Sequence, residues 1–215
     1  MGKTGTMHAW EQEDIRGPDI QTIGKALGAG FVPLSGVLLH EKIFQALTAG
    51  SGGLAHGHTF QVSDGDKTSS FQANIKQAHP LACAAAIAAQ NILQRDKLLQ
   101  QVVTLGKRLE ALLCREIGPL PLVGDIRGRG LFWAVEFVID KKAKTSFPLE
   151  ANFSNKVVAN ALKRGVNILG NLGHTGTYQV DHILVCPPYI TTEEELEKIV
   201  ALVKGAIVET SLSFI

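Results

Sequence analysis

Long apolar runs and blocks of like charge are missing from this sequence of 215 residues. The most hydrophobic stretch, residues 81–89, is far shorter than a membrane span, so the sequence argues against a membrane partner. Lys and Arg number 21 against 20 Asp and Glu. Because no basic stripe is present that could follow a phosphate backbone, we also expect no nucleic-acid partner.

Paired cysteines are missing too. The sequence has three cysteines, which are widely separated and outside any C-x-x-C pattern: Cys83, Cys114 and Cys186. This excludes a disulfide framework and a zinc site built on cysteines, and it indicates a reducing compartment. His56 and His58 have no carboxylate or cysteine at ligand spacing, so we expect no metal site. Residues 1–6 lack the character of a secretory or transit peptide, which favours the cytoplasm and leaves mitochondria open.

Strand-like and helix-like segments alternate along the chain and predict an α/β fold. Residues 19–36 read as an apolar strand that breaks into a glycine-rich turn, and Val37–Leu39 resumes a strand. Their unbroken apolar character predicts burial on both faces of a sheet. After His79-Pro80, leucines and valines recur at helical spacing, which predicts one long helix or two in succession before Gly118.

The composition changes at residues 118–124, which we interpret as a junction between a domain at 1–117 and a smaller α+β domain at 118–215. The second domain contains three further predicted elements: strands at 130–138 and 183–186 and a helix at 153–164. Thr192 and Glu195 match a capping box at the start of a final helix.

Lys25 is the candidate for covalent chemistry. Most lysines are solvated surface charges, but this one follows an apolar strand and lies between Gly24 and Gly28. Glycines there let a planar ring approach the backbone. A nucleophilic lysine needs surroundings that disfavour its ammonium form, and condensation with an aldehyde meets that need.

Several segments, in order and spacing, resemble successive motifs of the class III pyridoxal-phosphate-dependent aminotransferases: residues 2–12, 18–30 and 56–60. Residues 127–132 with Glu136, and Cys186-Pro-Pro188, resemble small-domain signatures of that family. The resemblance implies the type I fold of these transferases, here as a partial large domain that binds the cofactor at 1–117 and a small domain at 118–215.

The resemblance also implies roles for two residues. Lys25 would hold pyridoxal 5'-phosphate as a Schiff base and move a proton between substrate and cofactor. Thr59 would donate to the cofactor phosphate across the boundary of a homodimer, although His56-Gly-His-Thr59 alone reads as an ordinary polar turn.

The implied reaction is transamination between a small-molecule amino donor, which is an amine or an (omega-)amino acid, and an oxo-acid acceptor. Two alternatives stay open. One is another activity of the same fold, an aminomutase, racemase or decarboxylase. The other is a non-catalytic fragment or pseudoenzyme.

Several family features would precede Met1: the aspartate that pairs with the pyridine nitrogen, the glycine-serine loop that grips the phosphate, and the aromatic residue stacked on the ring. We therefore expect a partial sheet with uncovered edges and apolar faces, and an activity weakened by truncation. Gln179-Val-Asp-His182 stands where many relatives carry an arginine, so an amine or ω-amino acid fits better than an α-amino acid.

Three other features invite functional interpretations that their context does not favour. Residues 2–4 look like the end of a P-loop, but neither the preceding glycine pattern nor a strand is present. Arg127 and Arg129 are flanked by glycines before a strand, which favours a role in bracing a domain interface over carboxylate binding. Trp10 and Trp133 are expected in the core.

Residues 62–77 interrupt the family pattern, because removing them leaves Phe60-Gln61-Ala78-His79-Pro80. Their 16 codons can begin with a donor-like GTAAGT and end with an acceptor-like AAACAG. We interpret this segment as a retained intron, the alternative being a polar surface loop, which proteins generally tolerate.

Sequencing of the mature transcript tests this interpretation. We expect messenger RNA in which codon 61 is joined directly to codon 78. A continuous messenger that includes codons 62 to 77 would establish the loop instead.

Overall fold

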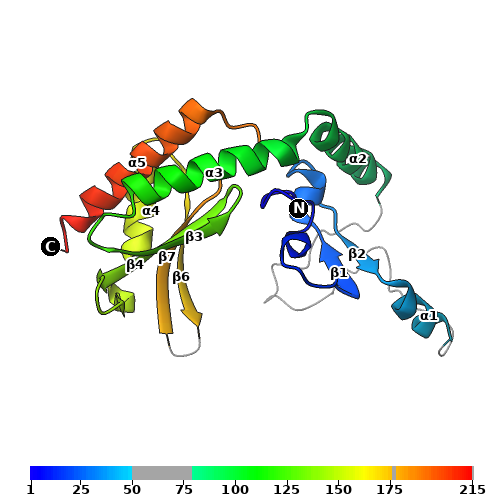
Figure 1. Ribbon diagram of the computed structural model, residues 1–215, viewed down its shortest axis with the longest axis horizontal. Coiled ribbons are helices and arrows are strands. Elements are labelled where there is room, and N and C mark those ends of the chain that lie inside the picture. Colours follow the sequence, from blue (N-terminus) through cyan, green and yellow to red (C-terminus); the bar gives the residue numbers. More distant parts are fainter. Residues whose placement is uncertain (50–78, 176–177, 215) are drawn as a thin grey trace, which may run out of the picture. The chain divides into compact units, whose positions relative to one another are not determined.

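The computed structural model describes residues 1–49, 79–175 and 178–214 (Figure 1). Its elements in chain order are η1 (Ala9–Gln12), β1 (Ile20–Ile23), η2 (Lys25–Gly28), β2 (Gly36–Leu39), α1 (Glu41–Ala49), α2 (Pro80–Arg95), α3 (Leu98–Glu116), β3 (Val123–Arg129), β4 (Phe132–Asp140), β5 (Thr145–Ser146), η3 (Leu149–Ala151), α4 (Phe153–Lys163), β6 (Leu169–Thr175), β7 (Tyr178–Val185) and α5 (Glu193–Ser211). This mixture of helices and sheets confirms the predicted α/β class.

The elements form two compact units. The first comprises Met1 and His8–Lys97, and the second comprises Gly2–Met7 and Leu98–Ile215. The expected junction at 118–124 lies inside the second unit, between α3 and β3. Since α3 packs with the sheet that follows it, contacts group it with the second unit, while the division at residue 117 stays a prediction.

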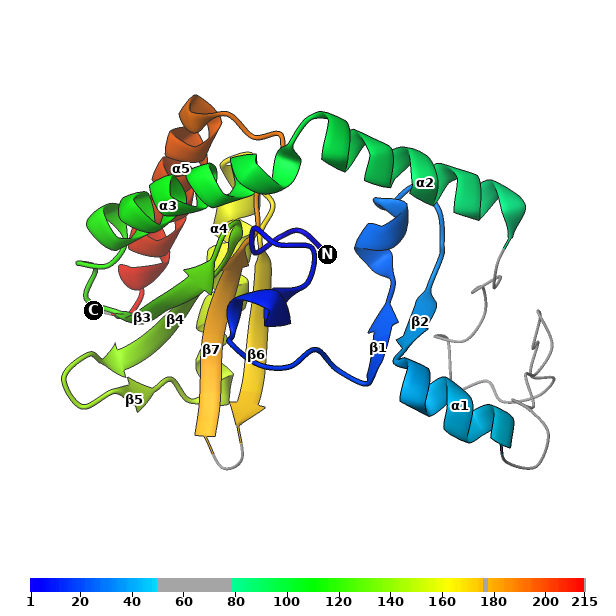
Figure 2. The same ribbon diagram turned by 45° about the vertical axis from the view of Figure 1, so that its right-hand side comes forward.

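The second unit is an antiparallel sheet with helices on one face. Strands β3, β4, β7 and β6 pair in that order, and β5 adds to β4. Along β4 and β7 the side chains alternate, so that Trp133, Val135, Ile183 and Val185 are buried while their neighbours are less so. Figures 1 and 2 show α3, α4 and α5 over this sheet. The period of two in the strands thus decides which face the helices cover.

The hydrophobic core of the described residues lies in this unit. Leu109 of α3, Phe137 of β4 and Ile207 of α5 are at most 1% exposed. Phe147 stacks on Phe153 with ring centroids 4.7 Å apart, and Phe137 meets Phe153 at 4.8 Å. Each such ring contributes roughly 2–3 kcal/mol by burial, so this aromatic group fixes the start of α4 on the sheet.

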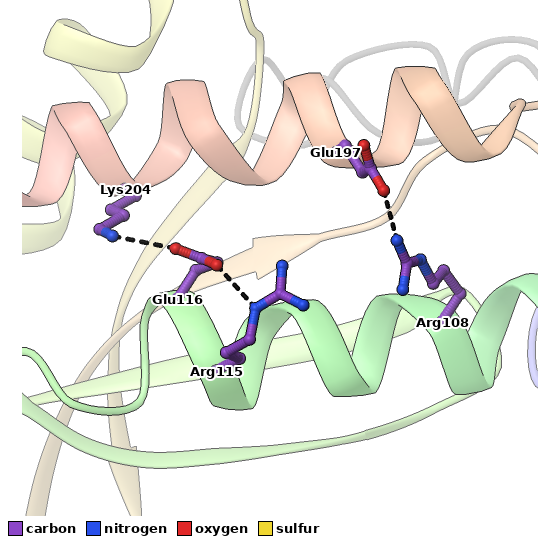
Figure 3. Close-up of polar contacts among 5 residues, drawn as sticks. All are labelled: Arg108, Arg115, Glu116, Glu197 and Lys204. Atoms are coloured by element: carbon purple, nitrogen blue, oxygen red, sulfur yellow. Dashed lines mark hydrogen bonds and ion pairs between the residues drawn. The ribbon is translucent and has the colours of Figure 1, made fainter.

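Ion pairs flank the contact between α3 and α5 (Figure 3). Arg108 of α3 binds Glu197 of α5, and Lys204 Nζ of α5 lies 3.0 Å from Glu116 Oε2 of α3. Arg115 Nε donates to the other oxygen of Glu116 over 2.7 Å. Hydrogen bonds from Arg115 and Lys204 hold the pKa of Glu116 below its usual range. These groups are largely exposed, so they set the register of the helices more than they stabilise the fold.

Asp181, on strand β7, binds the start of α4, which is distant from it in the sequence. Its two carboxylate oxygens accept from the backbone N–H groups of Phe153, over 3.1 Å, and Ser154, over 2.9 Å. Asp181 is 4% exposed. The first N–H groups of a helix have no partner within it, so this buried carboxylate serves as the cap that Asn152 does not provide.

Most predicted elements are present with shifted bounds. The capping box is confirmed: Thr192 Oγ1 accepts from Glu195 N over 3.2 Å, and the Glu195 carboxylate accepts from Thr192 N over 2.8 Å. The predicted helix after Pro80 is two helices, which separate at Lys97 with φ 50°. Strands β3, β5 and β6 lay outside the predicted set.

The described residues of the first unit form little core of their own. Strands β1 and β2 pair antiparallel, with Ile20 opposite Leu39. Ile20 is 56% exposed and Val37 is 57% exposed, so the predicted burial on both faces is wrong for these strands. The reason is that, among the described residues, β1 and β2 pair with each other and with no further strand. The expectation of uncovered apolar faces is met here.

The Asp181 cap gives a stability prediction. Asp181→Ala should lower the free energy of unfolding by about 2 to 3 kcal/mol, because two buried backbone donors lose a charged acceptor. Asp140 is the matched control, since its Oδ1 also accepts from two backbone N–H groups, those of Lys142 and Ala143, but at an exposed turn. Urea unfolding measures both.

We expect Asp140→Ala to cost less than about 1 kcal/mol. Equal losses in the two variants would contradict a special role of Asp181.

Candidate functional site

Lys25 begins the glycine-rich turn at the end of β1. Gly24 before it is extended, with φ −176° and ψ −162°, and Lys25 itself has φ 49° in the left-handed region. Leu27 N then donates to Gly24 O over 3.1 Å to close the turn. A left-handed conformation is unfavourable for a side chain with a Cβ. The backbone therefore turns sharply just where the strand ends, and Lys25 projects from that turn.

The Lys25 side chain is exposed and has no hydrogen-bond or ion-pair partner within the described part of the chain. It lines an open hollow of about 530 Å³ together with Ala26 and residues 30–33. A Cβ on Gly30 would meet no atom within 4 Å, so the glycine side of this hollow is open. The geometry thus offers an exposed primary amine beside a shallow, open hollow.

The two glycines beside Lys25 differ from their expected role. A Cβ on Gly28 would lie 2.8 Å from Val32 Cγ2, so Gly28 makes room for packing within the turn. At Gly24 a Cβ would make ordinary contacts with Ser35 at 3.5 Å. Of the glycines in this turn, Gly30 is the one that faces open space.

The second predicted cofactor contact, Thr59, lies outside the described residues, as do His56 and residues 62–77. The structure therefore does not test the proposed phosphate contact or the intron hypothesis, and both stay predictions from the sequence. Among the described residues, His, Cys, Asp and Glu form no group of three or more that could hold a metal ion.

Residues 2–7 pack on the second unit and form no phosphate loop. Lys3 Nζ donates to the carbonyl of Pro187 and lies 4.8 Å from the ring centre of Tyr189. Lys3 O accepts from Leu131 N over 2.9 Å. A Cβ on Gly130 would lie 2.6 Å from that same oxygen. Residues 2–7 thus form a strap, which is a segment that lies against the second unit, and Lys3 is bound to that unit.

Arg127 braces neighbouring strands of one sheet, whereas the sequence pattern favoured a brace at a domain interface. Its Nη1 lies 2.7 Å from Asp125 Oδ2 and 2.6 Å from Glu136 Oε2, the latter on the neighbouring strand β4. These hydrogen bonds raise the pKa of Arg127. Both carboxylates bind the same nitrogen, Nη1, so the charge of Arg127 is already paired within the sheet, which favours bracing over substrate binding. Trp133 is 4% exposed, as expected of a core residue.

One contact next to the lysine strand was missed by sequence reasoning. Gln21 of β1 binds both Trp10 and His8, which precede it by 11 and 13 residues. Trp10 was expected in the core, which is wrong: it is half-buried and its indole N–H donates to this glutamine. A polar residue in a short strand gives no pattern that identifies such a partner.

Comparison with known proteins decides the family. The family model described as "Aminotransferase class-III" matches residues 1–207 of the chain. The chain belongs to the class III aminotransferase family. An uncharacterized aminotransferase of Schizosaccharomyces pombe is 38% identical over 98% of the chain and 42% of its own length. An adenosylmethionine-8-amino-7-oxononanoate aminotransferase of Nitratidesulfovibrio vulgaris is 35% identical over 96% of the chain and 34% of its length.

Solved structures agree with this family. An (S)-enantioselective omega-transaminase from Thermomicrobium roseum has a TM-score of 0.78 at 30% identity, over 97% of the chain and 41% of that protein. The aminotransferase chain thus spans about two fifths of the length of such relatives. No helix among its described residues has the length and apolar character needed to cross a bilayer.

The strap lysine affects a neighbouring thiol. Burial raises the pKa of Cys186, and the charge of Lys3 opposes part of that rise. Burial likewise lowers the pKa of Lys3, with Cys186 acting against it. Because the thiolate is the reactive form, Cys186 should be alkylated more slowly at neutral pH than the exposed Cys114.

Lys3→Met tests this coupling. Removing the cation should raise the pKa of Cys186 further and slow its alkylation by iodoacetamide roughly twofold to fivefold near pH 8. Lys156→Met is the control, since Lys156 lies over the ring of Phe214 at 4.7 Å in the same unit. Mass spectrometry of the Cys186 peptide measures both rates, and equal rates in the two variants would refute the coupling.

Proposed function

We propose that this chain is the cofactor-lysine part of a pyridoxal-phosphate-dependent aminotransferase, in which Lys25 holds the cofactor covalently through Nζ. The observation that carries the proposal is the place of Lys25 at the edge of the hollow, with no partner among the described residues. An exposed amine beside an open glycine fits an aldehyde ring. When bound, the cofactor supplies an electron sink for the substrate carbon.

The chain's own residues have three tasks in this proposal. Lys25 Nζ holds the cofactor and carries the proton that moves at the substrate carbon. The turn from Gly24 to Gly30 keeps the amine at the strand end. Thr59, in a homodimer, donates to the cofactor phosphate of the partner subunit.

For the substrate we propose an amine or ω-amino acid as donor and an oxo acid as acceptor. In the segment 179–182 the structure describes two charged or polar side chains, Asp181 and His182. Neither carries a permanent positive charge that could bind the carboxylate of a substrate. Asp181 caps α4, and the ring of His182 lies 3.3 Å from Val180 O. The name of the omega-transaminase from Thermomicrobium roseum supports this choice.

The second candidate function is a non-catalytic chain that acts through association. The observation that favours it is the uncovered apolar surface of the first unit, where Phe31 is 86% exposed and Leu81 is 74% exposed. Exposed apolar side chains that form a contiguous patch mark contact surfaces. Binding of the cofactor distinguishes the two candidates. The compartment, which we propose to be the cytoplasm, is the same for both.

Titration of the chain with pyridoxal phosphate tests the proposed function. We expect an absorption band shifted from that of the free cofactor, lost entirely in Lys25→Ala. Lys97→Ala is the matched control, because Lys97 also has a left-handed backbone, with φ 50°. The control should keep the band. A band that survives in Lys25→Ala, or no band in the unchanged chain, would overturn the assignment of Lys25.

A further inference from the structure

The side chain of Gln21 is held at both ends. Its Oε1 accepts from Trp10 Nε1 over 3.1 Å, and its Nε2 lies 2.8 Å from His8 Nδ1. The rings of His8 and Trp10 stack, with centroids 5.8 Å apart and planes 6° from parallel. An amide that binds two stacked rings has one orientation, since exchange of its oxygen and nitrogen would oppose the indole donor with a donor.

A glycine makes room for this arrangement. A Cβ on Gly17 would lie 2.9 Å from Cη2 and 3.2 Å from Cζ3 of the Trp10 indole. The indole therefore lies against the backbone of Gly17, which leads into β1. Both the packing of the ring and its N–H then fix it relative to the strand.

The strand that carries Gln21 needs such an anchor. β1 has four residues, and in the part of the chain that the structure describes it pairs with β2 alone. A sheet of two strands is marginal in water without further packing. Gln21 lies opposite Leu38, and Ile23, at the end of β1, lies opposite Gly36. Two residues after Ile23 the chain enters the left-handed turn at Lys25.

Lys25 depends on the direction in which β1 ends. The turn after it is held by Leu27 N to Gly24 O, and by Gln90 Nε2 of α2, which donates to Leu27 O over 3.3 Å. These contacts fix the far side of the turn. On the side where β1 enters the turn, the support comes from Gln21. Among the described contacts, it is the side chain of β1 that hydrogen-bonds to another segment.

We propose that Gln21 is a positioning residue for Lys25. By binding Trp10 and His8 it fixes β1, and through the extended Gly24 it fixes the direction in which the lysine amine leaves the turn. The proposal rests on the proposed function, because it assigns Gln21 a role toward the group that Lys25 would hold. It adds to Lys25 a second residue of the segment 18–30, one to which the resemblance assigned no role.

The test is how readily Lys25 forms an adduct with pyridoxal phosphate in the 215-residue chain, measured as the yield of adduct. Borohydride fixes the adduct, and mass spectrometry of peptides gives its yield at each lysine. Lys97 serves as an internal reference, since unfolding would change the reactivity of both lysines. The measured quantity is therefore the ratio of Lys25 adduct to Lys97 adduct.

Gln21→Leu keeps the size of the side chain and removes both hydrogen bonds. We expect the Lys25 to Lys97 ratio to fall about fivefold. Gln21→Glu keeps the acceptor for Trp10 and should restore part of the ratio. Gln45→Leu, which removes a contact of 3.2 Å with Glu41 on α1, is the control and should leave it unchanged.

Trp10→Phe gives a second line of evidence if Gln21→Leu fails to fold. It keeps an aromatic ring against Gly17 but loses the donor, so the ratio should fall about twofold. In the double variant with Gln21→Leu the two losses should be less than additive, because they remove one shared hydrogen bond.

The outcomes separate the two proposals. A ratio near one in the unchanged chain would overturn the role of Lys25 itself. A high ratio that Gln21→Leu and Trp10→Phe leave unchanged would overturn the role of Gln21 and leave Lys25 as the cofactor lysine. Losses that add fully in the double variant would also contradict the shared contact.

Discussion

The burial of one face of the β3-β4-β7-β6 sheet against α3, α4 and α5 is the interaction on which the second unit of this aminotransferase chain depends. Val135 and Ile183, paired across β4 and β7, are fully buried in it. The polar devices of the unit act at its margins. Asp181 caps α4 from the sheet, and the strap of residues 2–7 is held by Lys3. Hydrophobic burial supplies the stability, and these contacts select a single arrangement.

The first unit differs, because the proposed cofactor lysine lies on described elements with little core. β1 and β2 expose apolar side chains, and Lys25 stands in a left-handed turn at their end. Where burial is small, individual hydrogen bonds carry a larger share of the order. The hydrogen bonds of Gln21 with Trp10 and His8 therefore contribute more to the order of β1 than they would in a well-packed core.

The sequence predicted features that depend on local patterns. The glycine-rich turn at Lys25, the capping box at Thr192 and the helices after Pro80 are encoded within a few residues of themselves. Strands β3 and β6 were missed, because Val123–Arg129 is interrupted by glycines and arginines and gains its strand form from pairing with β4. Gln21 was missed for the same reason, since its partners are distant in sequence. Thr59 lies outside the described residues.

The central claim is that Lys25 is the lysine to which the cofactor is joined. A crystal structure of the protein grown with pyridoxal phosphate tests it most directly. The account predicts continuous electron density between Lys25 Nζ and the aldehyde carbon of the cofactor. Density that joins the cofactor to a different lysine, or a cofactor bound with Lys25 Nζ out of bonding distance, would contradict it.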